Sequence, residues 1–153
     1  MEPSRRKALQ AAAAFGAVLA AGLLKPMAAL AAAWNKEAFD SKKVDDALKS
    51  LGAVGAEASS EILIEAPQIA ENGAVVPIEV NSNIRGTTSI AVLVDNNPFP
   101  LAAKFDFMAG ALPFVRVNVK MGQTANVRVV ATADGKHFTA SKEIKVTIGG
   151  CGG

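Results

Sequence analysis

A protein with a single cysteine cannot form a disulfide bond within its own chain, and Cys151 is the one cysteine among these 153 residues. Histidine is equally scarce, with His137 alone. One cysteine and one histidine are too few for a closed structural zinc site, which needs about four ligands. The sequence also lacks a glycine-rich phosphate loop and a nucleophile elbow. We therefore expect no metal, no cofactor and no catalysis by this chain alone.

His137 and the methionines offer little alternative chemistry. His137 follows Asp134-Gly135-Lys136, which predicts a hairpin tip, so we expect an ordinary exposed turn residue. A catalytic pair with Cys151 would require the C-terminal segment to fold back, and no third group that would orient the imidazole is evident. We interpret Met108 as packing filler and Met121 as the flank of a turn rather than as ligands.

Residues 1–33 have the organisation of an export signal. Arg5 and Arg6 lie in a charged segment, an apolar stretch runs from about residue 11 to residue 24, and alanines 31–33 offer an A-x-A cleavage site before Trp34. The apolar stretch is too short for a comfortable membrane span. The paired arginines favour the twin-arginine route, with cleavage near Ala33 and delivery to the periplasm. The alternative is an uncleaved amphipathic or anchoring helix.

The basic character of the whole chain belongs largely to this leader. Without residues 1–33, the chain keeps 12 basic and 13 acidic residues, a net charge of −1. Such a balance gives no electrostatic support for binding nucleic acid. About 120 residues form one domain that buries a sizeable core without disulfides. A lone cysteine in an oxidising compartment indicates a reactive or intermolecular thiol.

From residue 61 to residue 148 the hydrophobic pattern has a period of two. Seven or eight short alternating segments are separated by turn sequences such as Asn72-Gly73, Asn96-Asn97-Pro98 and Asp134-Gly135. This spacing predicts a mainly β fold, an immunoglobulin-like antiparallel sandwich whose last strand is Ile144–Ile148. Pro77 within a strand pattern predicts an edge strand or a bulge.

Residues 34–60 are predicted to form an N-terminal helical segment. Asn35 and Ser41 are candidate N-caps, and Gly52 is a candidate stop. The apolar residues between them recur at one-face helical spacing. This face requires a surface to cover it, which is either the edge of the domain or a second subunit.

Cys151 lies between two glycine pairs. Gly149, Gly150, Gly152 and Gly153 lack a Cβ, so we expect residues 149–153 to form a slim, flexible arm. Prenylation and lipoprotein anchoring both require a cysteine at another position. From Gly149 to Cys151 the arm extends roughly 10 Å. A thiol on such a tether suits covalent carriage of a group into another protein's active site, at high effective concentration.

The C-terminal sequence resembles that of the SoxY family, the sulfur-carrier subunits of the bacterial sulfur-oxidising system. The resemblance is strongest in residues 142–153, which end in Gly-Gly-Cys-Gly-Gly, and extends to residues 97–103, 120–124 and 133–136 and to the twin-arginine leader. It implies that Cys151 holds thiosulfate-derived sulfur intermediates during oxidation of thiosulfate to sulfate.

The resemblance also implies partners. A haem enzyme would load the thiol, a hydrolase would release sulfate, and a molybdenum-haem sulfur dehydrogenase would oxidise the remaining sulfur. The carrier would work as a heterodimer with a SoxZ subunit, for which residues 34–51 and one sheet face are candidate contacts. The alternative function is an exported immunoglobulin-like interaction module that uses Cys151 only for an inter-chain disulfide.

Overall fold

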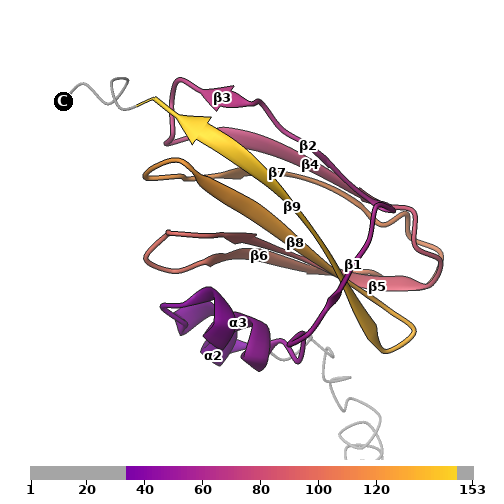
Figure 1. The fold of residues 1–153 in the computed structure, drawn as a ribbon. Helices are drawn as coiled ribbons and strands as arrows, with labels where there is room; N and C mark the ends of the chain where they lie inside the picture. Colours follow the sequence, from indigo (N-terminus) through magenta and orange to yellow (C-terminus); the bar gives the residue numbers. More distant parts are fainter. Residues whose placement is uncertain (1–33, 148–153) are drawn as a thin grey trace, which may run out of the picture. The chain divides into compact units, whose positions relative to one another are not determined.

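The computed structural model describes residues 34–147, which form a sandwich of two β-sheets with two short helices on one side (Figure 1). The larger sheet has the strand order β1-β9-β8-β5-β6, with β3 also paired to β9, and the smaller one has the order β2-β4-β7. This confirms the predicted mainly β, immunoglobulin-like fold. The elements are α2 (Lys36–Asp40), α3 (Val44–Ser50), β1 (Glu57–Ala58), β2 (Ile62–Glu65), β3 (Ile69–Ala70), β4 (Val76–Ser82), β5 (Thr87–Val94), β6 (Leu101–Asp106), β7 (Phe114–Val119), β8 (Ala125–Ala133) and β9 (Lys136–Val146).

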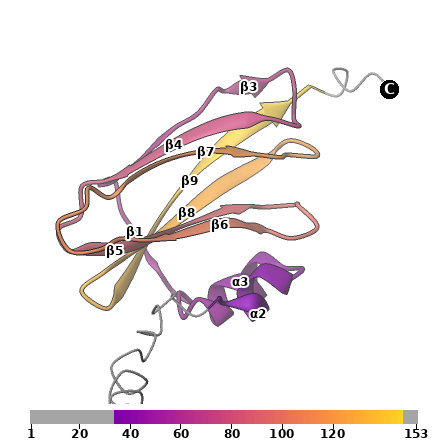
Figure 2. The ribbon, with the colours of Figure 1, turned by 180° about the vertical axis from the view of Figure 1, so that it is seen from behind.

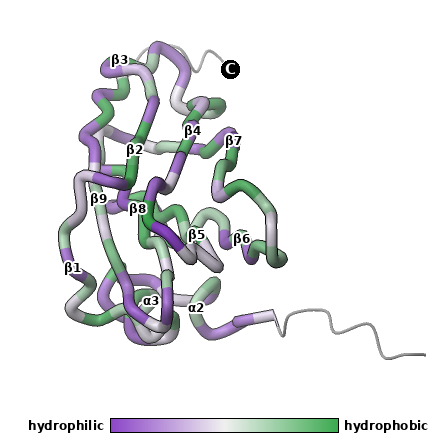
Figure 3. Tube along the Cα trace, turned by 90° about the vertical axis from the view of Figure 1, so that its right-hand side faces the viewer, coloured by the Kyte–Doolittle hydropathy of each residue, from purple (hydrophilic) through white to green (hydrophobic). Residues whose placement is uncertain are grey.

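The period-two pattern places one face of each sheet in the core. In β4, Val76, Ile78 and Val80 are fully buried and alternate with more exposed residues. Successive side chains of a strand point to opposite faces, so this alternation separates the core from the surface. Figure 3 shows the resulting layers, in which the β2-β4-β7 sheet lies over the larger sheet and α2 and α3 lie beneath it.

The helices cover the outer face of the larger sheet. Ala38 of α2 and Ala47 of α3 have no exposed surface and share a buried cluster with Leu93 of β5. Because this cover adds a second buried face, six consecutive residues of β5, from Ser89 to Val94, are buried. Of the two surfaces considered for the helical segment, the structure shows its apolar side on the domain's own sheet.

The helix boundaries confirm one predicted cap and correct another. Asn35 is the N-cap of α2, and its side-chain oxygen accepts a hydrogen bond from the backbone N–H of Ala38 at 3.0 Å. Ser41 does not cap α3; its hydroxyl donates to the carbonyl of Glu37, and Lys43 occupies the N-cap position of α3 without a capping bond from its side chain. Gly52 has a φ of 72° and ends the segment as predicted.

Asn35 also joins the two helices, because its amide nitrogen donates to the carbonyl of Ser50 at 2.9 Å. We expect Asn35→Ala, which loses both bonds, to lower the free energy of unfolding by about 1–2 kcal/mol. Asn35→Asp keeps the capping acceptor and loses only the donor, so its loss should be smaller. Urea unfolding of the three proteins measures this order, and equal stability of Asn35→Ala and wild type would contradict it.

The predicted segment boundaries need two corrections. Residues 34–60 are not helical throughout, because β1 lies within them and pairs in parallel with β9 through Glu57 and Phe138. The last strand begins at Lys136 rather than at Ile144, since its first half pairs with β8 across the Asp134-Gly135 turn. The described part of this strand ends at Val146, and Ile148 lies outside the described residues.

Two single-residue predictions also differ from the structure. Pro77 lies in β4, the central strand of its sheet, where it pairs with Asn118 of β7 but lies beyond the end of β2, whose pairing stops at Glu79. Its missing N–H is tolerated there because a neighbouring strand is present on one side only. Met108 is 86% exposed and fills no core space. Met121 flanks the bend at residues 122–124, as predicted, and its side chain is in addition buried in the core.

Candidate functional site at the end of strand β9

The predicted carrier residue, Cys151, and the glycines 149, 150, 152 and 153 lie outside the described residues. The structure does describe the base of the arm, which consists of the end of β9 from Ile144 to Val146 and the next residue, Thr147. Figure 1 shows the tip of β9 beside β3. Cys151 is four positions after Thr147 in the sequence, so the covalent chain keeps the two Cα atoms within roughly 14 Å of each other.

Backbone hydrogen bonds from both sides hold the base of the arm. Lys145 donates its N–H to the carbonyl of Gln68 at 3.0 Å, and Thr147 donates to the carbonyl of Ala70 at 3.1 Å. On the other side, the N–H of Val146 donates to the hydroxyl of Thr124 at 3.0 Å. Ile144 has no exposed surface. The chain is therefore anchored as far as Thr147.

Gly73 packs directly against this base. Its carbonyl accepts a hydrogen bond from the N–H of Met121 at 2.7 Å. A Cβ at Gly73 would lie 2.3 Å from the carbonyl oxygen of Met121 and 2.8 Å from a methyl carbon of Val146. Only glycine fits between them. The sequence marked Gly73 as a turn residue, and its packing role depends on contacts with residues about 50 and 70 positions away, which local spacing does not reveal.

Apart from the leader, four segments carry the sequence resemblance, and three of them meet at this end of the sandwich. The side-chain amide of Asn97 donates to the carbonyl of Lys120 at 2.7 Å, which joins segment 97–103 to segment 120–124. Thr124 then bonds to Val146 at the base of the arm. The fourth segment, 133–136, forms the β8–β9 turn at the opposite end of β9. Most of the resemblance therefore surrounds the base of the arm.

The surface beside the base has mixed charge. A hollow of about 400 Å³ is lined by Gln68, Ile69, Lys142, Glu143 and Lys145. The ammonium of Lys142 donates to the carbonyl of Ala66 at 2.8 Å. The ammonium of Lys42, which lies between α2 and α3, is 3.3 Å from the ring centre of Phe99 on the loop between β5 and β6. This cation–π contact connects the link between the helices to this end of the sandwich.

His137 is not the exposed turn residue that was predicted. It lies within β9, opposite Thr132 of β8, and is partly buried. Its Nδ1 lies 3.1 Å from the hydroxyl of Thr132. His137 stands at the start of β9, whereas the arm follows the end of that strand, so we assign His137 no part in the chemistry of the thiol.

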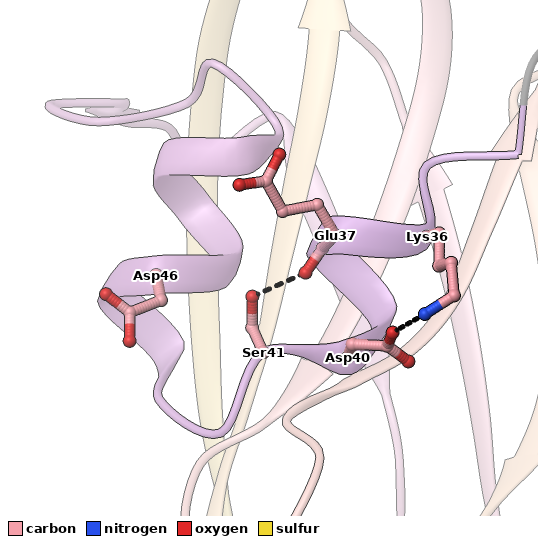
Figure 4. Close-up of a pocket in the computed structure, with 5 residues that line it drawn as sticks. All are labelled: Lys36, Glu37, Asp40, Ser41 and Asp46. Carbon is pink, nitrogen blue, oxygen red and sulfur yellow. Dashed lines mark hydrogen bonds and ion pairs between the residues drawn. The ribbon is translucent and has the colours of Figure 1, made fainter.

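A second hollow, of about 530 Å³, lies along the helices and is lined by Lys36, Glu37, Asp40, Ser41 and Asp46 (Figure 4). The hydrogen bond and the charge of Asp40 raise the pKa of Lys36 above its ordinary value.

Within residues 34–147, no group of three or more histidine, cysteine or carboxylate side chains is arranged to hold a metal ion. No helix in the same range is long and apolar enough to cross a membrane.

Comparisons with known proteins agree with the sequence resemblance. A family model described as sulfur oxidation protein SoxY matches residues 48–151. The solved structure of the sulfur carrier protein SoxY from Chlorobium limicola f thiosulfatophilum is 40% identical, with a TM-score of 0.63 over 69% of this chain and 97% of that one.

A more distant likeness concerns the fold alone. The superoxide reductase (neelaredoxin) from Ignicoccus hospitalis is 18% identical and has a TM-score of 0.51 over 69% of this chain and 93% of its own. No curated protein sequence matches the chain.

Proposed function

The chain belongs to the SoxY family of sulfur oxidation proteins, and we propose that it carries thiosulfate-derived sulfur covalently on the thiol of Cys151. The family is that of the sulfur carrier of the Sox system, so the role of carrier follows from membership. The assignment of the cargo to Cys151 follows from the sequence, which offers no other thiol.

The observation that most favours Cys151 is its position relative to the anchored end of β9. Thr147 is held by the carbonyl of Ala70, and the glycine-flanked cysteine follows four residues later. The Cα atom of Cys151 therefore stays within roughly 14 Å of the Cα atom of Thr147, which is fixed on the domain. The short tether supports a mechanism in which each enzyme docks beside the base of the arm and receives the thiol in its active site at high effective concentration.

The chemistry on the thiol follows the steps implied by the family. A haem enzyme joins thiosulfate to Cys151: the thiol loses its proton, two electrons pass to the haem, and a sulfur–sulfur bond forms. A hydrolase then uses water to release the terminal group as sulfate, which leaves a persulfide. The molybdenum-haem sulfur dehydrogenase takes six electrons from the outer sulfur while water supplies three oxygens. A second hydrolysis releases sulfate and restores the thiol.

In this proposal the catalysis belongs to the partner enzymes, and the chain with its SoxZ-like subunit presents the substrate. Export with the leader 1–33 by the twin-arginine route would place the pair in the periplasm, where the enzymes act. The division into leader, helical segment, sandwich and arm 149–153 belongs to the same proposal.

Intact-mass analysis of the protein from thiosulfate-grown cells tests the proposal. We expect a series of sulfur adducts that peptide mapping assigns to Cys151 and that a thiol reductant removes. Protein from cells grown without reduced sulfur is the control and should lack the series. A constitutive disulfide-linked dimer with no sulfur adducts would instead support the exported interaction module.

A further inference from the structure

The end of β9 continues beyond the strand with which it pairs. β8 begins at Ala125, which stands opposite Ile144, so β8 does not reach Val146. A strand end without a neighbour leaves its N–H groups to water, and such ends open readily. Residues 145–147 nevertheless donate all three of their backbone N–H groups to acceptors within the domain. The end of β9 is thus held further along the chain than the ladder with β8 alone would hold it.

The acceptors of these three N–H groups differ in kind. On the β3 side, the N–H groups of Lys145 and Thr147 donate to backbone carbonyls of the segment around β3. On the β8 side, the N–H of Val146 donates to a side chain, the hydroxyl of Thr124, at 3.0 Å. Thr124 directly precedes β8, so its hydroxyl takes the place of the carbonyl that a longer β8 would supply. Of the three bonds, this one alone depends on which amino acid occupies a position.

The bend that carries Thr124 is fixed on both sides. Before it, the N–H of Met121 donates to the carbonyl of Gly73 at 2.7 Å, and after it, the carbonyl of Asn126 accepts from Asp95 at 2.9 Å. A threonine side chain is branched at Cβ, which restricts its χ1 rotamers. The hydroxyl is therefore presented to the end of β9 from a rigid position. Figure 2 shows β3 and the β7–β8 connection at the same end of the sandwich as the tip of β9.

We propose that Thr124 is a positioning residue, which sets the point at which the chain leaves the domain and thereby the reach of the Cys151 thiol. This inference rests on the proposed function, in which partner enzymes receive that thiol. With Thr147 held, the Cα atom of Cys151 stays within roughly 14 Å of it. When residues 145–147 open, the last anchored residue is Ile144, seven positions before Cys151, and the reach becomes roughly 24 Å.

The length of the tether matters because it fixes the effective concentration of the thiol in a docked enzyme. For a flexible tether, this concentration falls roughly as the −3/2 power of the length or more steeply, so a change from about four residues to about seven lowers it roughly twofold. The loss of one neutral hydrogen bond shifts an opening equilibrium about fivefold. Chain ends open at free energies near zero, where such a shift makes the open form the major one.

Amide hydrogen exchange of the purified protein, measured by NMR, tests the proposal without any enzyme. Thr124→Val keeps the shape of the side chain and removes the hydroxyl. The informative amide is that of Thr147, because the substitution does not touch its own acceptor. We expect its protection to fall about fivefold in Thr124→Val and to return in Thr124→Ser, which keeps a hydroxyl. The matched control is Thr88→Val, which removes an exposed hydroxyl bond to the carbonyl of Thr132 near the start of β9 and should leave this protection unchanged.

Turnover by the haem enzyme with the purified carrier measures the functional effect. We expect Thr124→Val to lower kcat roughly twofold at an unchanged KM for the carrier, because delivery of the thiol changes and the docking surface does not. Insertion of three glycines between Gly149 and Gly150 lengthens the tether to the same extent and leaves Thr124 in place. This variant should lower kcat by the same factor while the protection of Thr147 stays at the wild-type level.

Each outcome of these measurements supports or overturns the proposal. Unchanged melting temperatures show that the fold is retained, and Thr124→Ala is the second variant for the case in which valine itself disturbs the bend. Wild-type protection of Thr147 without the hydroxyl would overturn the proposal, as would full kcat in the glycine insertion. Missing adducts on Cys151 with protection that depends on Thr124 would refute the proposed function alone. Adducts with protection that does not depend on Thr124 would refute this inference alone.

Discussion

Replacement of Cys151 with serine is expected to abolish thiosulfate oxidation by the reconstituted enzyme system, with a loss of at least about 10³-fold in turnover. A serine hydroxyl does not form a sulfur–sulfur bond with thiosulfate, and its pKa leaves almost no anion at neutral pH. The melting temperature should not change, because residue 151 lies beyond Thr147, which is the last residue for which the structure describes a hydrogen bond. Turnover with the purified enzymes and thermal unfolding are measured on the same preparations.

A relocated thiol provides a matched control. Val54 is 71% exposed, so the double variant Cys151→Ser, Val54→Cys keeps one exposed thiol but removes it from the arm. We expect this variant to react with a small thiol reagent and still to give no turnover. Full turnover in either variant would contradict the assignment of the cargo to the arm. Restoration by the thiol at position 54 would show that the enzymes do not require the arm.

Among the substitutions considered, Gly73→Ala is expected to destabilise the protein most. It should lower the free energy of unfolding by about 3 kcal/mol and the melting temperature by roughly 12 °C. The new Cβ would lie 2.3 Å from the carbonyl oxygen of Met121, a backbone atom that no side-chain rotation can move away. Relief of the clash requires the turn to separate from the base of the arm.

Gly122 is the control for this substitution, since nothing lies within 4 Å of the position of its Cβ. Gly122→Ala should change the free energy of unfolding by no more than about 0.5 kcal/mol. Thermal unfolding of both variants measures the difference. Equal melting temperatures for Gly73→Ala and Gly122→Ala would show that the turn adjusts freely, and would contradict the role of Gly73 in fixing the end of β9.

Local patterns were sufficient for the strands that bury one face. In β4, Val76, Ile78 and Val80 alternate with more exposed neighbours, and this period of two predicted both the strand and its inward face. The cap at Asn35 and the stop at Gly52 were predicted for the same reason, since both depend on residues close in sequence. Ser41 shows the limit of that approach, because its hydroxyl donates to the carbonyl of Glu37 in the preceding helix and does not cap the following one.

Distant contacts could not be predicted. The strands β1 and β3 have two residues each and exist only because β9 lies beside them. His137 was expected at an exposed tip, but the pairing of β8 with β9 starts at Lys136 and draws it into the sheet. Met108 was interpreted as packing filler rather than as a ligand, and only the fold shows that its side chain is 86% exposed.

The sequence by itself determined the fold class and the single possible site of thiol chemistry, because hydrophobic period and residue scarcity are properties of the chain alone. It also predicted the family, through the glycine-flanked Cys151. The tertiary structure decided what surrounds these features: Gly73 against the end of β9, the helices over the larger sheet, and the exposed loop with Met108 and Leu112 at the far end. These depend on which distant residues become neighbours, and that is settled only when the whole chain packs.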